Sequence, residues 1–203
     1  SDENIAQLRQ GGLSLPSTAS GSAGGTDRDY YLNTDEKSVK LREQYVEHVA
    51  KLFGLAGDTR TAAQAGAQGV LRIETELAKV SLSRAALRNP QASYHKMKLA
   101  EVATYTGDLD WPAFFAATGA PKIAELNLAP PEFFKGFATQ LKTAPIADWQ
   151  AYLKWKLLHD SAPFLGAAFA GEDFRFYSGV IAGVQDQKPR WRRVAATIDT
   201  TVG

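Results

Sequence analysis

The sequence predicts a mainly α-helical protein, with several helices packed around one long helix and at most a short strand or hairpin. Three observations support this fold class. Apolar residues recur at three- and four-residue steps over most of the chain, which is the spacing of one helix face. The longest such stretch runs from residue 145 to residue 169. Apolar residues make up 44% of the 203 residues, enough for the core of one domain.

Charge and cysteine content argue against several classes of protein. Lys and Arg total 23 and Asp and Glu total 22, so the net charge is +1, whereas nucleic-acid binders usually carry a strong basic excess. No apolar run approaches the roughly 18 residues of a membrane helix, and no secretory signal is recognisable at the start. The absence of cysteine excludes disulfides and thiolate metal ligands. We therefore expect neither a nucleic-acid partner nor a membrane segment in this chain.

Residues 1–26 are predicted to form a flexible N-terminal segment, followed by a helical domain over residues 27–203. Ser1–Gln10 carries few large apolar residues and is expected to be a frayed helical turn. Ser17–Thr26 is composed of small residues, which bury too little surface to offset their ordering entropy. We interpret that stretch as a mobile loop or linker.

Caps and apolar faces predict the first two helices of the domain. Thr34, followed by two acids, marks the start of the first, because acids suit the positive end of the helix dipole. Gly54 and Gly57 end it, and Asp58 or Thr59 caps the second. The two apolar faces comprise Val39, Tyr45, Val46, Val49, Leu52 and Phe53, and then Ala62, Ala65, Val70, Ile73, Leu77 and Val80.

The second predicted helix contains two glycines and two acids with different implications. Gly66 and Gly69 each weaken a helix by about 1 kcal/mol relative to alanine, so they indicate close backbone contact with a neighbouring helix. Glu74 and Glu76 are interpreted as a solvated or ion-paired face, the usual role of paired acids on a helix.

Between residues 89 and 144, turn residues divide the chain into shorter elements. Asn89-Pro90 is a break, followed by a predicted third helix over residues 91–105 that uses Tyr94, Met97, Val102 and Tyr105. Asp110 caps a short helix that Gly119 ends. Alternation within residues 122–129 predicts the one short strand, and Pro130-Pro131 starts a helix. Its aromatic residues Phe133, Phe134 and Phe137 are interpreted as core anchors.

The stretch from Pro145 to Phe169 is predicted to be the central helix, on which the other helices pack. Pro145 suits the first turn, and Pro163 is expected to bend or interrupt the helix, since its ring clashes with the preceding turn. Glu172-Asp173 is expected to cap a further helix, and Lys188–Arg193 to open the last one. The apolar stripe of the central helix comprises Trp149, Tyr152, Leu153, Leu157, Phe164 and Phe169, widened by Trp155 and Leu158.

The residues display no recognisable catalytic motif. His48, His95 and His159 stand far apart, none begins an H-E-x-x-H motif, and each is interpreted as a surface or partly buried residue. No G-x-S-x-G is present, and the glycines within residues 21–25 precede no phosphate-binding helix. We therefore predict no catalytic and no metal-binding residue in this chain, and substrate-binding residues stay unassigned.

The basic run Lys188–Arg193 contains Trp191 and admits two interpretations. Basic residues interleaved with an aromatic residue suit single-stranded nucleic acid. Because only four basic residues take part and the net charge is low, a salt-bridged helix start with arginine stems packed on Trp191 is favoured.

Several local motifs occur together in an order that resembles one family. G-G-L-S-L-P at residues 11–16, with D-R-D-Y-Y-L at residues 27–32, resembles the "GGLxLPxRDYYL" segment of neprilysin-like zinc metallopeptidases. Residues 17–26 stand between these two parts, which the family joins directly. Further matches in family order are Tyr45–His48, Ile73–Ala78, Arg88–Pro90 with Tyr94–Met97, Asp110-Trp111, Asp148–Trp155, Phe174–Tyr177 and Arg190–Val194.

This resemblance implies a helical cap domain that faces a zinc domain across an internal chamber, which admits peptides and excludes folded proteins. The family's H-E-x-x-H motif, third glutamate ligand and catalytic histidine and arginine match no residue here. The resemblance therefore implies zinc in the full-length parent and none in this chain. It also implies that the partners are the catalytic domain of the same polypeptide and peptide substrates, in an extracytoplasmic location.

Two hypotheses follow from these observations. The first is the N-terminal cap fragment of a zinc-dependent endopeptidase, in which a zinc-bound water activated by glutamate attacks a peptide carbonyl. On this hypothesis the chain restricts access by size and is inactive alone. The alternative is a non-enzymatic helical scaffold or peptide-binding module. A continuation of the gene into an H-E-x-x-H helix would decide between them.

Overall fold

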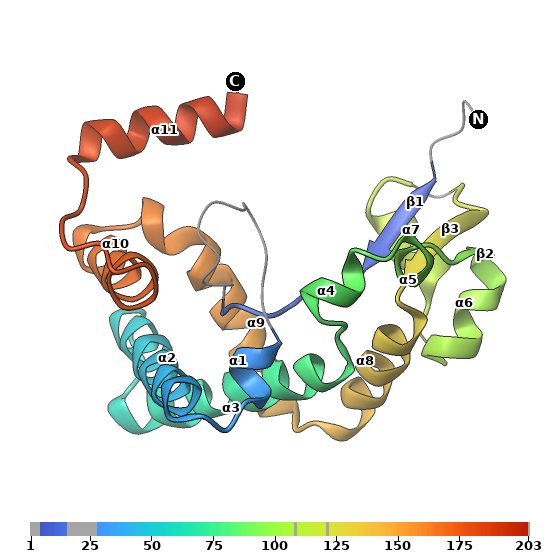
Figure 1. Ribbon diagram of the computed structural model, residues 1–203, viewed down its shortest axis with the longest axis horizontal. Helices are drawn as coiled ribbons and strands as arrows, with labels where there is room; N and C mark the ends of the chain where they lie inside the picture. Colours follow the sequence, from blue (N-terminus) through green and yellow to red (C-terminus); the bar gives the residue numbers. More distant parts are fainter. Residues whose placement is uncertain (1–4, 16–27, 108, 121, 203) are drawn as a thin grey trace.

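The computed structural model describes residues 5–15, 28–107, 109–120 and 122–202, and confirms a mainly α fold (Figure 1). The predicted loop Ser17–Thr26 lies outside the described residues. The helices are α1 (Asp29–Leu32), α2 (Glu36–Leu55), α3 (Arg60–Val80), α4 (Arg84–Leu87), α5 (Pro90–Ser93), α6 (Leu99–Thr106), α7 (Trp111–Ala117), α8 (Pro131–Thr143), α9 (Ile146–Ser161), α10 (Ala167–Asp173) and α11 (Arg190–Val202). A 3-10 helix, η1 (Ala162–Phe164), a π-helix, η2 (Phe174–Ile181), and the strands β1 (Ala6–Arg9), β2 (Lys96–Lys98) and β3 (Glu125–Ala129) complete the elements.

The central helix is α3, and not the stretch from Pro145 to Phe169 as predicted. Helix α3 packs against α1, α2, α8 and α9, whereas α9 packs mainly on α3. Thr59 caps α3 as expected, with its hydroxyl oxygen accepting the Ala62 N–H. The first turns bury Ala63 and Ala67 in place of the predicted Ala62 and Ala65. A stripe with few bulky residues made this helix less prominent in the sequence than the aromatic-rich α9.

Two glycines explain how closely α3 meets its neighbours, as the sequence predicted. A Cβ atom placed on Gly66 would lie 2.8 Å from the Phe53 ring. A Cβ atom on Gly69 would lie 2.7 Å from the Asp148 carboxylate and 3.3 Å from the Asp148 Cα atom. The glycines therefore let α2 and α9 approach the backbone of α3, which offsets their low helix propensity.

The long helix predicted to begin at Pro145 is interrupted at Pro163, as the sequence predicted. Helix α9 ends at Ser161, Pro163 lies in η1, and α10 follows from Ala167. The aromatic residues Trp149, Tyr152 and Trp155 are buried. Contrary to the predicted stripe, Leu153 and Leu157 are 65% and 69% exposed, because the aromatic side of α9 faces α3. Phe164, which lies in η1, is 68% exposed.

A small three-stranded sheet forms the other end of the molecule and includes two strands that were not predicted. The strand order is β1-β3-β2, with β1 parallel and β2 antiparallel to β3. The expected helical turn within Ser1–Gln10 is wrong, because Ala6–Arg9 pairs with Leu126–Ala129. The expected helix over residues 91–105 is also wrong, because β2 separates α5 from α6. Both strands depend on pairing with the distant β3, which local periodicity does not reveal.

The remaining sequence predictions have mixed outcomes. Asp35 caps α2, one residue after the predicted Thr34, and Asp110 caps α7 as predicted, both through their carboxylates. Pro131 begins α8. Phe133 and Phe134 are buried as core anchors. Glu172-Asp173 does not cap a helix, because α10 already begins at Ala167 and continues into η2.

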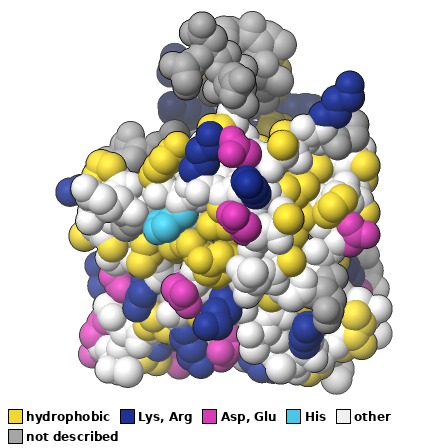
Figure 2. Space-filling view, turned by 90° about the vertical axis from the view of Figure 1, so that its right-hand side faces the viewer, with side chains coloured by type: hydrophobic (Ala, Val, Ile, Leu, Met, Phe, Trp, Pro, Cys, Tyr) yellow, Lys and Arg dark blue, Asp and Glu magenta, His cyan; other side chains and the backbone are white. Residues whose placement is uncertain are grey.

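The elements are arranged in two ends joined by α3 and α8 (Figure 1). One end holds α2, α9 and α10, and the other holds the sheet with α6 and α7. Helix α11 stands apart from the helices of the first end (Figure 1). Figure 2 shows the face at the sheet end, where hydrophobic side chains lie in patches between charged ones.

Candidate functional site

The three histidines lie in two different parts of the structure. His48 on α2 is fully buried, contrary to prediction, and approaches the same Trp155 and Tyr177 rings as His159 on α9. His95 precedes β2 in the sheet, where its backbone N–H donates to Asn127. Among the residues that the structure describes, no three His, Asp or Glu side chains are grouped as metal ligands.

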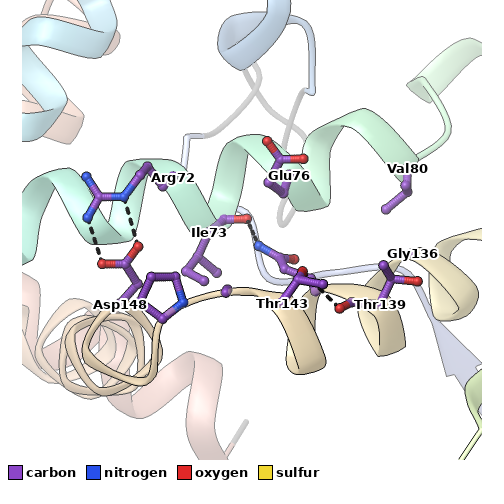
Figure 3. A pocket seen from close by; sticks show the side chains of 11 residues that line it. Arg72, Ile73, Glu76, Val80, Gly136, Thr139, Thr143 and Asp148 are labelled. Atoms are coloured by element: carbon purple, nitrogen blue, oxygen red, sulfur yellow. Dashed lines mark hydrogen bonds and ion pairs between the residues drawn. The ribbon is translucent and has the colours of Figure 1, made fainter.

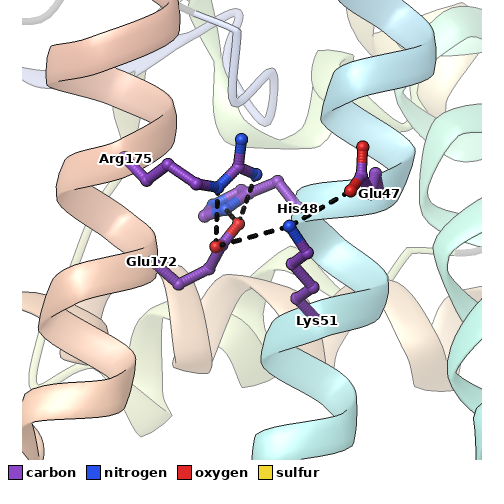
Figure 4. A network of polar contacts seen from close by, with 5 residues as sticks. All are labelled: Glu47, His48, Lys51, Glu172 and Arg175. Carbon is purple, nitrogen blue, oxygen red and sulfur yellow. Dashed lines mark hydrogen bonds and ion pairs between the residues drawn. The ribbon is translucent and has the colours of Figure 1, made fainter.

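His48 belongs to a polar network between α2 and the α10–η2 helix (Figure 4). Its Nδ1 atom lies 2.9 Å from Glu172, which also accepts hydrogen bonds from Arg175 at 2.7 and 2.5 Å. Burial opposes ionisation of Glu172, but the hydrogen bonds from Arg175 and His48 outweigh burial and lower its pKa to about 2. Burial lowers the pKa of His48, so its ring is neutral and Nδ1–H donates to the Glu172 carboxylate. The network joins α2 to the α10–η2 helix.

Glu74 is buried, which corrects the interpretation of both acids on α3 as a solvated or ion-paired face. Its side chain is 0% exposed and accepts hydrogen bonds from Ser14 Oγ at 2.6 Å, Tyr31 Oη at 2.9 Å and Tyr45 Oη at 2.7 Å. Burial raises its pKa to about 7. Glu76 is exposed and pairs with Lys79 at 2.6 Å, as expected.

The sequence did contain a signal for the burial of Glu74. It follows Val70 by four residues and precedes Leu77 by three, so it lies on the apolar face of α3. The position therefore favours burial, and a buried carboxylate requires hydrogen-bond donors. Those donors come from three other parts of the chain, which the sequence pattern does not bring together.

Residues 5–15 form an N-terminal strap that connects the two ends of the molecule. Its β1 strand pairs with β3, and the Gln10 side chain both donates to and accepts from the backbone of Leu82, at 2.9 and 2.8 Å. Beyond that point, Tyr152 Oη donates to the Gly12 carbonyl at 2.8 Å. Leu15 is fully buried in the helical core. This part of the predicted flexible segment is thus docked along its length.

A groove of about 480 Å³ lies between α3 and α8 (Figure 3). Arg72 Nε and a terminal nitrogen donate to the two oxygens of Asp148 at 2.8 and 2.7 Å. Gln140 donates to the Ile73 carbonyl at 2.8 Å. The charged residues of this groove are ion-paired, since Glu76 pairs with Lys79, and the contacts hold α3 against α8 and α9.

Helix α9 has an exposed apolar side that does not contribute to the core. On α9, Ile146, Leu153 and Leu157 are 74%, 65% and 69% exposed. Their spacing of seven and four residues places them on one side of the helix, opposite Trp155. Single exposed apolar residues are normal, whereas a contiguous exposed stripe marks an interaction surface.

Helix α11 carries a second set of exposed apolar side chains. Trp191, Val194 and Ile198 recur at three- and four-residue steps and are 67%, 49% and 54% exposed. The Arg192 guanidinium lies 5.1 Å from the centre of the Trp191 ring, in agreement with the predicted packing of an arginine on Trp191. A groove of about 340 Å³ separates α11 from η1 and α10 and is lined by Phe164, Leu165 and Ile198.

Fold and surface together define the class of this protein: a mainly helical domain with its own core and with exposed apolar side chains on α9 and α11. A family model for the N-terminal part of a peptidase family, described as "Peptidase family M13", matches residues 1–203. The chain belongs to peptidase family M13, which confirms the neprilysin-like family expected from the motifs.

Curated relatives and solved structures agree with this assignment. Human endothelin-converting enzyme 1 is 27% identical over 211 residues, covering 100% of this chain and 26% of the human protein. Neprilysin-3 of Drosophila melanogaster is 30% identical over 115 residues, covering 57% of this chain and 13% of the fly protein. Zinc metalloprotease Zmp1 of Mycobacterium tuberculosis, in complex with an inhibitor, is 27% identical with a TM-score of 0.87, covering 98% of this chain and 29% of Zmp1.

The chain therefore spans about a quarter of the length of the curated relatives that match all of it. In the part of the chain that the structure describes, no helix is long and apolar enough to cross a membrane.

Proposed function

We propose that this chain is the N-terminal helical cap domain of a zinc-dependent endopeptidase that acts on peptides. It covers the substrate chamber and restricts access by size. The exposed apolar side chains of α9 and of α11 carry this proposal. Burial of each exposed leucine on α9 is worth about 1.5–3 kcal/mol, which favours a permanent contact over exposure to water.

The partner at this face is the catalytic domain of the same polypeptide. The relatives that match this chain extend far beyond the matched part, which supports a further domain. Zmp1 is known both in an open state, with a TM-score of 0.86 to this chain, and in complex with an inhibitor. A chamber whose cap moves relative to the catalytic domain is consistent with these states. A non-enzymatic scaffold is disfavoured by membership of a peptidase family.

In this proposal the zinc ion is bound by the remainder of the polypeptide. Zinc in a peptidase acts as a Lewis acid and lowers the pKa of a bound water. The described residues of this chain do not fit a zinc ion, because no three of their His, Asp or Glu side chains are grouped as ligands. We assign them no catalytic step. An extracytoplasmic location follows from the same family resemblance.

The proposal is tested with leucine variants of the complete polypeptide. Leu157→Asp places a charge on the apolar face of α9, and Leu141→Asp is the control, since Leu141 is an exposed leucine on α8. We expect Leu157→Asp to loosen the cap and to raise the cleavage of a folded protein relative to a short peptide by about tenfold, the equivalent of about 1.4 kcal/mol. Equal ratios in both variants and the parent would contradict the proposal.

A further inference from the structure

The groove between α11 and the η1–α10 segment is lined by two arginines and, among the described residues, by no acidic side chain. Its volume is about 340 Å³. Arg190 and Arg193 come from the first turn of α11, and Thr197 lies one turn further along. The walls of the groove are mostly apolar and include Phe164, Leu165, Val194 and Ile198.

The two guanidinium groups have no partner in the part of the chain that the structure describes. The Nε atom of Arg193 is buried and makes no hydrogen bond. Other partly exposed cations are paired, Arg175 with Glu172 and Lys154 with Asp58. A buried charged donor without an acceptor is unfavourable, because it loses water and gains no hydrogen bond. Arg193 therefore requires an acceptor from outside the described residues.

The position of these arginines on α11 also favours a negative partner. The first turn of a helix carries the positive end of the helix dipole, where cations are unfavourable and anions favourable. Helix α11 has no acidic residue in that turn. Arg192 packs on the Trp191 ring and does not line the groove. The positive charge of Arg190 and Arg193 at the groove is thus not compensated by α11 itself.

The chemistry of the groove suits a carboxylate that stands beside an apolar side chain. The planar guanidinium fork matches the two oxygens of a carboxylate. The apolar walls disfavour the polyanionic backbone of a nucleic acid, which would lose its water there. Val194 and Ile198 line the groove and also belong to the exposed apolar side chains that we assign to the contact with the catalytic domain. A domain of the same polypeptide keeps Arg193 paired at all times, whereas a peptide substrate would leave it unpaired between turnovers.

We propose that an Asp or Glu side chain of the catalytic domain, flanked by an apolar residue, occupies this groove and forms an ion pair with Arg193, with Arg190 beside it. This inference rests on the proposed function, because it takes the catalytic domain as the partner. It adds the chemistry of the contact, which is an acidic side chain enclosed by apolar ones. The ion pair fastens α11 to the catalytic domain.

Zero-length cross-linking of the complete polypeptide with a carbodiimide tests the inference. The reagent joins an amine to a carboxylate in contact with it, so Arg193→Lys makes the proposed ion pair linkable. Without added peptide, mass spectrometry should find residue 193 joined to an Asp or Glu outside residues 1–203. Lys188, which is exposed and does not line the groove, is the internal control and should not join to that acid. Coupling of residue 193 only to acids within residues 1–203, only to an added peptide, or to no acid would overturn the inference.

Hydrogen exchange of α11 in the complete polypeptide gives a second measurement. Arg193→Gln should make exchange in residues 190–202 at least about tenfold faster, because it leaves the buried carboxylate unpaired. Lys188→Gln removes the same charge from an exposed position and should leave the exchange unchanged. Unchanged or slower exchange in Arg193→Gln would contradict the inference.

The two proposals fail in different experiments. If Leu157→Asp weakens size selection but residue 193 does not cross-link to the catalytic domain, this inference alone is wrong. If residue 193 cross-links to the catalytic domain but Leu157→Asp leaves size selection unchanged, the ion pair stands and the proposed function is wrong.

Discussion

Gly69 shows how one residue fixes the distance between two helices. The absence of a side chain lets Asp148 of α9 lie against the backbone of α3. From that position Asp148 accepts two hydrogen bonds from Arg72, one turn of α3 further along. The contact thus combines a close backbone approach with a bidentate ion pair, and each depends on the other.

Gly69→Ala is predicted to destabilise the chain by about 1–3 kcal/mol, the usual range for overpacking a filled site. The new Cβ atom would meet both the carboxylate and the Cα atom of Asp148, so a side-chain rotation alone cannot relieve the clash. Gly54→Ala in α2 is the control, because a Cβ atom there meets nothing within 4 Å. The control is expected to be neutral or stabilising by up to about 1 kcal/mol. Chemical denaturation measures the free energy of unfolding of both variants, and equal changes in the two would refute the role of Gly69.

Residue-scale features were predictable where the cause lies in the local sequence. The close contacts at Gly66 and Gly69 followed from their low helix propensity, and the Asp110 cap followed from its position before Trp111-Pro112. The hydrogen bonds of Glu74 were not predictable, because its donors come from residues 14, 31 and 45. Periodicity indicates that a residue faces the core, but it does not identify the side chains it meets there.

At the scale of the element, α9 is apolar on two sides. Trp149, Tyr152 and Trp155 face the core, and a second stripe that includes Leu153 and Leu157 faces away from it. Sequence periodicity detected a helix with a wide apolar surface but could not decide which side meets α3. The strands were harder to predict for a different reason, since β1 and β2 are short and exist through pairing with β3.

Asn127→Ala is predicted to destabilise the sheet by about 2–4 kcal/mol. The buried amide accepts the His95 N–H at 2.6 Å and donates to Gln7 Oε1 and the Ser93 carbonyl at 2.7 and 2.9 Å. Its removal leaves three polar groups without their partner, each costing about 1 kcal/mol or more. Hydrogen exchange in β1 and β2 should become faster when the Asn127 side chain is removed. Asn33→Ala, at an exposed site, is the control and should change stability by less than about 0.5 kcal/mol.

At the scale of the whole molecule, the strap and α3 join a sheet end and a helical end into one structure. Its polar networks, at Glu74 and at His48 with Glu172, are internal and hold elements together. What is left facing outward on α9 and α11 is an apolar surface. The proposed packing of this chain on the catalytic domain of the same polypeptide would cover this surface, in a chain that otherwise has a filled core.

The most direct test is the solvent exposure of this surface in an experimental structure of the complete polypeptide. The account predicts that Leu153, Leu157 and Trp191, which are 65%, 69% and 67% exposed in this chain, lose most of that exposure to contacts with the remainder of the polypeptide. If these three side chains remain as exposed in the complete polypeptide as they are here, the central claim is wrong.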